Sequence, residues 1–308
     1  MRLLAFCTIP LLALAVPAAA DHHAKPVTNS AAITVDPVLA AAVADPKRDA
    51  DRARDQWRKP GETLTFFQVA PDMKVGEYAP GGEWYSRLLG LYLGPKGKLV
   101  GLYFNPTSGP FNAQSQQGIR DGAAKYPADI AGWSGIPADR FAGMTLENLP
   151  EAEKGTFDRI LVMRMMHNLF RWNIADREIR AMRDLLKPGG MIGIEQHRAK
   201  ANAPYSYTDG SKGYMREKDI IAFMEMHGFA FVGSSRANAN PKDPANWADG
   251  VWTLPPVRTS APRDSGAVSG FNPTRTLVTA AMRPRDDTIS QLPPCSPSRP
   301  PNAPGRSA

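Results

Sequence analysis

Hydrophobic and polar positions follow two different periods along the middle of the chain. Short apolar runs, each bounded by turn residues, predict strands, and stretches with helical spacing lie between most of them. The predicted strands are residues 74–78, 98–104, 139–143, 157–163, 191–195, 229–234 and 275–282. The predicted helices are residues 84–93, 118–126, 175–186 and 217–227. This rhythm predicts an α/β domain, a mostly parallel sheet with helices on both faces.

The segments outside this rhythm predict a helical extension, two loops and a tail. Residues 36–58 have the pattern of two short helices separated by Pro46, and a further helix is predicted over 61–67. Residues 105–117 are polar and predict a loop after the second strand, and residues 237–274 predict a long irregular segment. We expect one domain over residues 36–283 and a disordered, proline-rich tail over 284–308.

The first twenty residues are typical of a secretory signal peptide. Arg2 precedes an apolar run over residues 3–16, and three alanines ending at Ala20 supply the small side chains that signal peptidase accepts. The run is too short to cross a bilayer comfortably. We therefore expect cleavage after Ala20 and a periplasmic or secreted product without stable membrane insertion. An uncleaved membrane anchor is the alternative, because Arg2 is the single charge before the run.

The predicted mature chain begins with Asp21, His22 and His23, followed by a leader predicted to be disordered over residues 21–35. A histidine third from a free amine is a candidate ligand set for copper(II) or nickel(II). Two surface histidines in a polar leader are the simpler interpretation. Cys7 leaves with the signal peptide, so Cys295 cannot form an intrachain disulfide.

Composition and charge narrow the class of partner. The net charge of +7 is spread along the chain, without the clustered Lys and Arg or the interleaved aromatic residues of a nucleic-acid surface. We expect no nucleic-acid partner and a small-molecule substrate. The sequence does not fix the oligomeric state.

Candidate ligand contacts begin at the end of the first predicted strand. Glu77 is followed by Ala79, Gly81 and Gly82, an acid and then a tight turn into a helix, where a backbone approaches a ligand closely. In an open parallel sheet, ligands bind at the carboxyl ends of the strands. The full G-x-G-x-x-G fingerprint is absent, which argues against NAD or FAD and favours a ligand without phosphate.

A more specific pattern extends from residue 157 to residue 195. It comprises the fourth strand, which leads into His167 and Asn168, then a helix, the turn Lys187-Pro-Gly-Gly190 and the fifth strand. This run resembles the class I S-adenosylmethionine-dependent methyltransferases and, within them, a group of secreted bacterial predicted methyltransferases. The resemblance covers about residues 45–283. It implies a Rossmann-like, seven-stranded sheet whose last strand is antiparallel, and S-adenosylmethionine as the cofactor.

The resemblance also implies roles for residues of the cofactor site. Glu77 matches the acid that meets the methionine amino group, and Gly81 and Gly82 match part of the glycine loop. Ala79 and Glu83 stand where the family has its first and last glycines. Asn105 stands where the family has the acid that holds the ribose hydroxyls; its amide can still bond a hydroxyl. The aspartate that often meets the adenine amine is missing around Met144 and Thr145.

Candidate catalytic residues lie at the ends of the fourth and fifth strands. The resemblance implies that His167 and Asn168 lie beside the transferred methyl, where His167 is a candidate base near neutral pH. Glu195, near His197, is a candidate to hold or activate a nucleophile. Packing for His167 and a surface-loop role for Glu195 are the alternatives. Five residues of the loop after the sixth strand are candidates for a substrate lid or for a capped loop: Asn238, Asn240, Lys242, Asp243 and Trp252.

Two functions are compatible with these residues. The first is an exported methyltransferase that acts on an unknown, small-molecule acceptor by in-line displacement. The second is a catalytically inactive, methyltransferase-like ligand-binding protein of the periplasm. Export favours the second, because S-adenosylmethionine is made in the cytoplasm, and so do the non-glycine residues of the loop and Asn105.

Overall fold

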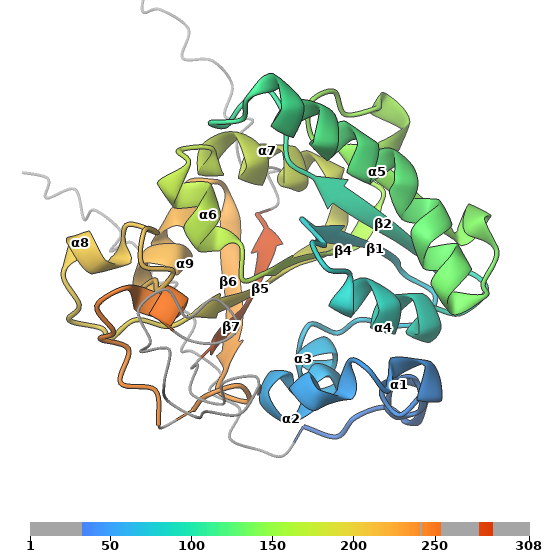
Figure 1. Cartoon of the computed structure of the whole chain (residues 1–308), viewed down its shortest axis with the longest axis horizontal. Coiled ribbons are helices and arrows are strands. Elements are labelled where there is room, and N and C mark those ends of the chain that lie inside the picture. The colour runs from blue at the N-terminus through green and yellow to red at the C-terminus, as the bar shows by residue number, and fades with distance from the viewer. Residues whose placement is uncertain (1–32, 241, 254–276, 286–308) are drawn as a thin grey trace, which may run out of the picture.

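A computed structural model describes residues 33–240, 242–253 and 277–285 of the chain (Figure 1). One sheet of seven strands organises these residues. The strands are β1 (Lys74–Tyr78), β2 (Lys98–Tyr103), β3 (Phe141–Thr145), β4 (Phe157–Met163), β5 (Leu186–His197), β6 (Phe229–Ser235) and β7 (Leu277–Pro284). The prediction of a seven-stranded α/β sheet is confirmed.

Nine α-helices are described around this sheet. They are α1 (Pro37–Val43), α2 (Asp55–Arg58), α3 (Pro60–Phe66), α4 (Trp84–Tyr92), α5 (Ala113–Ser134), α6 (Met166–Arg171), α7 (Ala175–Leu185), α8 (Tyr205–Thr208) and α9 (Glu217–Met226). The predicted N-terminal helices correspond to α1, α2 and α3, with short 3₁₀ turns between α1 and α2. No described helix is long and apolar enough to span a membrane.

The strand order is β3-β2-β1-β4-β5-β7-β6. The pairs from β3 to β5 are parallel, and β7 runs antiparallel to both of its neighbours. The expected antiparallel last strand is therefore confirmed. From β1 the chain builds outward to β2 and β3, then returns to place β4 on the other side of β1. The order thus reverses between β1 and β4, and their carboxyl ends are the place where such sheets bind ligands.

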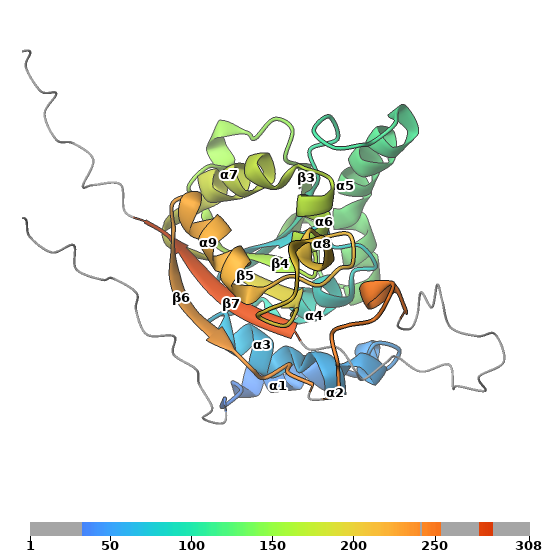
Figure 2. The ribbon, with the colours of Figure 1, turned by 90° about the vertical axis from the view of Figure 1, so that its left-hand side faces the viewer.

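Apolar side chains form a separate core on each face of the sheet. Ile179 and Met182 of α7 and Met224 of α9 pack on one face. Leu64 of α3 and Leu88 of α4 pack with other residues on the opposite face. Figure 2 shows the same layers, with α7 and α9 on one side of the sheet and α1 to α3 on the other. Both faces are covered, which explains why the central strands read as continuous apolar runs.

The helix after β2 is longer than predicted. The sequence predicted a loop over 105–117 and a helix over 118–126, whereas α5 occupies Ala113–Ser134. Its start is set by Asn112, whose side-chain oxygen accepts a hydrogen bond from the Ser115 amide at 2.8 Å. Its end is set by Gly135 at φ 73°. The polar first turns of α5 lack the apolar spacing on which the prediction relied.

Two further expectations are corrected around β4 and β5. His167 and Asn168 do not end the fourth strand but lie in the first turn of α6, which the sequence pattern did not reveal because it is one short, buried turn. The sequence placed the turn over residues 187–190 before a fifth strand that begins at residue 191, whereas β5 spans Leu186–His197. The backbone is already extended at Leu186, so this turn forms the start of β5.

Several predictions concern residues that the structure does not describe. The signal peptide over 1–20, the Asp21-His22-His23 hypothesis, most of the leader and all but the first two residues of the 284–308 tail lie outside the described ranges. The same is true of Cys295 and of residues 254–276.

The packing of α5 on β3 leads to a matched pair of predictions. A Cβ on Gly143 would lie 2.0 Å from the carbonyl oxygen of Ala123, whereas a Cβ on Gly118 would meet no atom within 4 Å. We expect Gly143→Ala to lower the free energy of unfolding by about 1–3 kcal/mol, because backbone must move. Gly118→Ala should raise it by about 0.5–1 kcal/mol, since alanine favours helix. Urea denaturation measures both, and equal effects would contradict this packing.

Candidate active site

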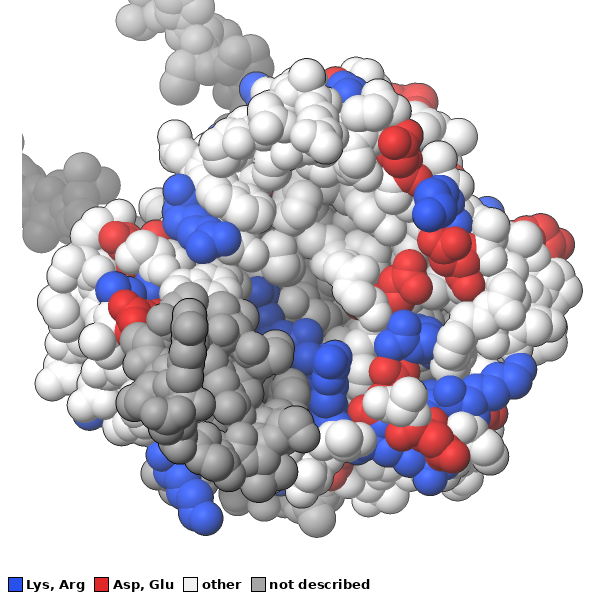
Figure 3. All heavy atoms as spheres, viewed as in Figure 1, with Lys and Arg blue, Asp and Glu red and all other residues white. Residues whose placement is uncertain are grey.

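The candidate site lies at the carboxyl ends of β1, β4 and β5. In Figure 1 the arrowheads of β1 and β2 point to the middle of the view, where the chain enters α6. Figure 3 shows that this face is hollowed near its centre and that Lys and Arg side chains lie along one side of the hollow. The polar residues at these strand ends define its chemistry.

The loop after β1 keeps a glycine-like conformation at two positions that are not glycine. Ala79 has φ 49°, Gly81 has φ 57° and Glu83 has φ 59°. Left-handed backbone of this kind costs a residue with a Cβ roughly 1–2 kcal/mol, so the surrounding fold must hold it in place. A Cβ on Gly82 would meet no atom within 4 Å, so the loop borders open space there.

Glu77 lies beneath this loop and is buried. Its Oε2 accepts a hydrogen bond from the Ser86 hydroxyl in the first turns of α4. Burial raises the pKa of Glu77 to about 8, although the Ser86 hydrogen bond and the positive charge of Arg164 act against this rise. Glu77 therefore holds its proton at neutral pH in the unliganded protein, and a nearby cation would favour its ionisation.

Glu195, at the end of β5, is fully buried and already engaged through both carboxylate oxygens. The Tyr85 hydroxyl donates to Oε2 at 2.9 Å, and Arg164 Nη1 lies 3.2 Å from Oε1. The Arg164 backbone amide also donates to the Glu195 carbonyl oxygen. Glu195 thus joins α4 to the segment after β4. The alternative of a role in a surface loop does not fit, because Glu195 is buried.

Arg58 brings a second guanidinium group to the site from the N-terminal helices. It ends α2, is buried, and lies 4.4 Å from the ring centroid of Trp84, which begins α4. Burial and then the charge of Arg164 lower the pKa of Arg58 to about 9, while Tyr85 and Glu195 act in the opposite direction. The N-terminal extension therefore contacts α4, the helix that follows the loop after β1. Sequence reasoning did not select Arg58, because nothing local links it to β4.

Asn105 lies two residues after β2, and the oxygen of its side-chain amide is hydrogen-bonded within the chain. Its Oδ1 accepts from the backbone amide and hydroxyl of Thr107 at 3.0 and 2.8 Å, which leaves its amide nitrogen as the group to meet a ligand. The backbone amide of Asn105 donates to Glu178 Oε1 at 3.0 Å, and the Tyr78 hydroxyl donates to Glu178 Oε2 at 2.8 Å. Glu178, a buried acid on α7 that the sequence reasoning missed, fixes this loop.

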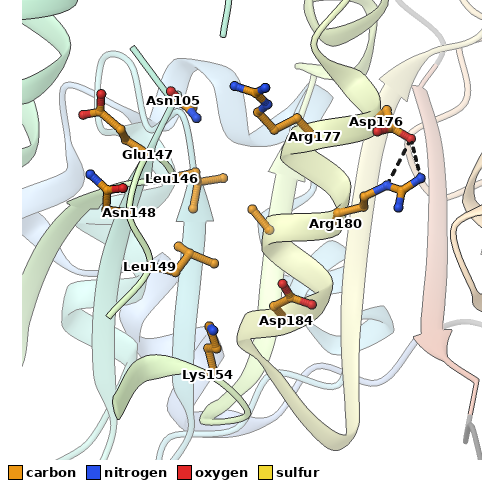
Figure 4. A pocket seen from close by; sticks show the side chains of 11 residues that line it. Asn105, Leu146, Glu147, Asn148, Leu149, Lys154, Asp176, Arg177, Arg180 and Asp184 are labelled. Atoms are coloured by element: carbon orange, nitrogen blue, oxygen red, sulfur yellow. Dashed lines mark hydrogen bonds and ion pairs between the residues drawn. The ribbon is translucent and has the colours of Figure 1, made fainter. Parts of the chain in front are cut away.

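A groove of about 840 Å³ runs from Asn105 along α7. Figure 4 shows the chain after β3 on one side, with Glu147, Asn148 and Leu149, and α7 on the other, with Arg177 and Asp184. Charged side chains border it and the leucines contribute apolar surface. Only its Asn105 end reaches the strand ends at which the other candidate residues lie.

His167 is buried on α6 and contacts β5. Its Nδ1 lies 3.4 Å from Oε1 and 3.3 Å from Nε2 of Gln196, so this contact alone does not select a tautomer. Gln196 also donates to the Gly213 carbonyl oxygen at 2.7 Å, which fixes its amide. Asn168, beside it, donates to the Met165 sulfur at 3.4 Å. His167 is thus positioned rigidly, and its catalytic role stays a prediction.

The segment after β6 is tied to the body at several points. Asn238 donates to the Thr63 hydroxyl of α3 at 2.9 Å, and Asp243 accepts from the Tyr214 hydroxyl at 3.0 Å. Asn240 accepts from the Lys242 backbone amide at 3.0 Å. These contacts fit the capped-loop interpretation. Trp252 differs, because its ring centroid lies 5.5 Å from that of His167.

Comparisons with known proteins concern the fold. No protein-family model and no curated protein matches the chain. Similar solved structures include a SAM-dependent methyltransferase from Aquifex aeolicus, at 13% identity over 81% of this chain and 100% of the other, with a TM-score of 0.45. They also include the [4+2]-cyclase SpnF, at 14% identity over 74% and 80% of the chains, with a TM-score of 0.45.

A third similar structure is the methyltransferase CalH in complex with SAH, at 11% identity over 73% and 55% of the chains, with a TM-score of 0.39. The Rossmann-like character of the fold is given by its own sheet order and by the single antiparallel strand β7. At these identities the likeness concerns fold alone. Among the described residues, no group of three or more His, Cys, Asp and Glu could hold a metal ion.

The strained loop predicts an unusual response to glycine. We expect Ala79→Gly to raise the free energy of unfolding by about 0.5–1 kcal/mol, because glycine adopts positive φ without steric cost. Ala181→Gly, in the middle of α7, should lower it by a similar amount. Guanidinium denaturation compares the two variants. A lower free energy of unfolding in both of them would show that Ala79 is not strained.

Burial of Glu77 predicts a pH-dependent effect on stability. The pKa of Glu77 is about 8 in the folded protein, whereas an ordinary glutamate, as in the unfolded chain, has a pKa of 4.5. Between these two pH values the folded protein therefore binds one proton more than the unfolded chain does. Stability of the wild type relative to Glu77→Gln therefore falls as the pH rises from about 4.5 to 8. Urea denaturation at pH 5 and pH 8 should show that the free energy of unfolding of Glu77→Gln, relative to that of the wild type, is higher at pH 8 than at pH 5. Glu151→Gln, at an exposed carboxylate, is the control, and a difference that does not change with pH would contradict the raised pKa.

Proposed function

We propose that this chain is an exported, S-adenosylmethionine-dependent methyltransferase that acts on a small-molecule acceptor. The observation that carries the proposal is the loop after β1. It turns through three left-handed residues, Ala79, Gly81 and Glu83, at the carboxyl end of the strand where the sheet order reverses. A loop held at the cost of strain in two non-glycine residues supports a ligand site rather than a simple turn.

The residues present fit the proposed cofactor. The loop borders open space at Gly82, which leaves room for a ligand against the backbone. Glu77 beneath it supplies a carboxyl group that a cationic amine would hold ionised. Asn105 Nδ2 has no hydrogen-bond partner among the described residues and is placed to donate to a hydroxyl oxygen. Gly81, Gly82 and Ala79 contribute backbone alone.

When bound, S-adenosylmethionine supplies an electrophilic methyl group on a sulfonium. The chain's contribution is positioning and, where the acceptor must lose a proton, a base. His167 is the proposed base: it lies in the first turn of α6, shortly after the end of β4, and its ring contacts the Gln196 amide. Asn168 and Glu195 complete the proposed catalytic set, with Glu195 holding Arg164 and Tyr85 in place. Trp252, whose ring centroid lies 5.5 Å from that of His167, is the proposed shield of this base from water.

The inactive ligand-binding protein remains the second candidate, and a specific observation favours it. Both oxygens of Glu195 are engaged and His167 is 4% exposed, so neither group is open to a substrate in this conformation. Export also favours it, since the cofactor is a cytoplasmic metabolite. The two candidates share a ligand site and differ only in whether methyl transfer follows binding.

Isothermal titration with S-adenosylhomocysteine tests the shared site. We expect a dissociation constant in the micromolar range, equivalent to about 8 kcal/mol. Glu77→Gln should weaken binding at least tenfold, because the amide cannot become an anion opposite the ligand amine, about 1.4 kcal/mol. Gln114→Ala, on the exposed start of α5, is the matched control and should bind as the wild type does.

The outcomes separate the candidates. No binding at millimolar concentration rejects the methyltransferase proposal. Binding with formation of S-adenosylhomocysteine from S-adenosylmethionine, when a panel of acceptors is supplied, supports the enzyme. Binding without turnover on any acceptor supports the second candidate.

A further inference from the structure

Arg171, in the last turn of α6, contacts two tryptophan rings. Its Cζ atom lies 5.0 Å from the ring centroid of Trp172 and 5.3 Å from that of Trp252. The Trp252 indole nitrogen donates to the Ser211 carbonyl oxygen at 2.9 Å, which holds that ring in place. Trp172 packs in a T-shaped arrangement against Phe104, with 5.5 Å between the ring centroids. The side chain of Arg171 therefore lies against two rings that are themselves fixed.

The guanidinium group of Arg171 makes no hydrogen bond or ion pair with any described residue. The loop over residues 209–211 passes close by, because a Cβ on Gly210 would lie 3.0 Å from the Arg171 amide nitrogen. The acid of this loop, Asp209, accepts instead from the Ser211 backbone amide at 2.8 Å. Partial burial lowers the pKa of Arg171, and no neighbouring acid raises it. An aromatic face offsets part of a positive charge but offers no oxygen to the N–H donors, so these stay available to a ligand.

Arg171 lies beside the candidate base. His167 comes four residues earlier in α6, so the two side chains leave the helix on the same face. Trp252 connects them in space, because its ring centroid lies 5.5 Å from that of His167 and Arg171 contacts the same ring. In Figure 3 a basic side chain borders the hollow where Figure 1 draws α6, and Arg171 is the one Lys or Arg residue of that helix. A ligand group bound to Arg171 would lie at the rim of this hollow.

We propose that Arg171 binds a carboxylate group of the methyl acceptor and so determines which acceptors the protein takes. The planar N–H donors of a guanidinium group match the two oxygens of a carboxylate. The rings beside Arg171 favour an organic anion over inorganic phosphate, because an aromatic surface binds carbon-rich groups. Phe111 extends this surface, with its ring centroid 5.5 Å from that of Trp172. The acceptor therefore combines a carboxylate with a planar, apolar body, as an aromatic acid does.

This inference rests on the proposed function for the role of the ligand as methyl acceptor. The proposed cofactor contacts lie at Glu77 and the loop after β1, so the carboxylate in question belongs to the acceptor and not to S-adenosylmethionine. Binding of an organic anion at Arg171 can be measured without methyl transfer. Its failure can therefore be told apart from failure of the proposed function.

Three aromatic probes test the site: benzoate, the neutral benzamide and phenyl phosphate. Each is titrated to millimolar concentration into the wild type, with and without S-adenosylhomocysteine, and binding is followed by tryptophan fluorescence, since Trp172 and Trp252 lie at the site. Arg171→Gln removes the charge, and Arg171→Lys keeps the charge but not the planar fork. Arg180→Gln removes the same charge from an exposed ion pair on α7 and is the matched control.

We expect benzoate to bind the wild type in the millimolar range and benzamide to bind at least tenfold more weakly. Arg171→Gln should weaken benzoate binding at least tenfold and leave benzamide unchanged, because only the anion uses the guanidinium group. Arg171→Lys should retain part of the affinity for benzoate, and Arg180→Gln should match the wild type. Phenyl phosphate should bind no more tightly than benzoate, and tighter binding that depends on Arg171 would contradict the assignment to a carboxylate.

Three outcomes overturn the proposal: benzoate does not bind, benzoate and benzamide bind alike, or Arg171→Gln, folded by its thermal transition, binds benzoate as the wild type does. If Arg171→Gln does not fold, Arg171→Lys takes its place, and an unchanged affinity for benzoate then contradicts the proposal. Failure of the proposed function has a different signature, because S-adenosylhomocysteine would not bind the wild type. Benzoate binding that depends on Arg171 would still support the carboxylate site in that case.

Discussion

Parallel pairing of β1 with β4 is the constraint on which the rest of the molecule depends. The register sets Tyr78 against Val162, so the two strands end side by side. Both strands are buried between two apolar cores, and Ile160 and Leu161 show no exposure. A slip of one residue would turn each apolar side chain toward the wrong core. The cores therefore fix where the chain leaves each strand, and with it the position of Glu77 and Arg164.

Buried polar groups join the pieces that this sheet brings together. Glu178 connects α7 to the loop after β2, and Glu195 connects β5 to α4 through Tyr85 and to the end of β4 through Arg164. A buried carboxylate is costly without such partners, and removing a partner from one is strongly destabilising. The same groups that shape the site thus also hold its walls together, which makes the site rigid and sensitive to substitution.

The site combines two electrostatic tendencies at one place. Burial keeps Glu77 protonated at neutral pH, while Glu195 at the end of the neighbouring strands pairs with the guanidinium group of Arg164. A cationic group near Glu77 would favour its ionised form, whereas Glu195 already holds the charge of Arg164. Charge arrangement of this kind is a property of the assembled fold, because β1, β4 and β5 each contribute one member.

The sequence by itself determined the sheet, its approximate strand positions and the strand ends where Glu77, Gly81 and Gly82 lie, because burial on both faces leaves long apolar runs and turns leave glycine. It did not determine α6 or the start of α5, since a single buried turn and a polar first turn carry no apolar period. The tertiary structure alone decided that Ala79 and Glu83 adopt the left-handed conformation, that Tyr85 and Arg164 engage Glu195, and that Arg58 packs on the Trp84 ring. Tyr85 and Glu195, for example, are 110 residues apart in the chain, and no local pattern of hydrophobic and polar residues encodes such a contact.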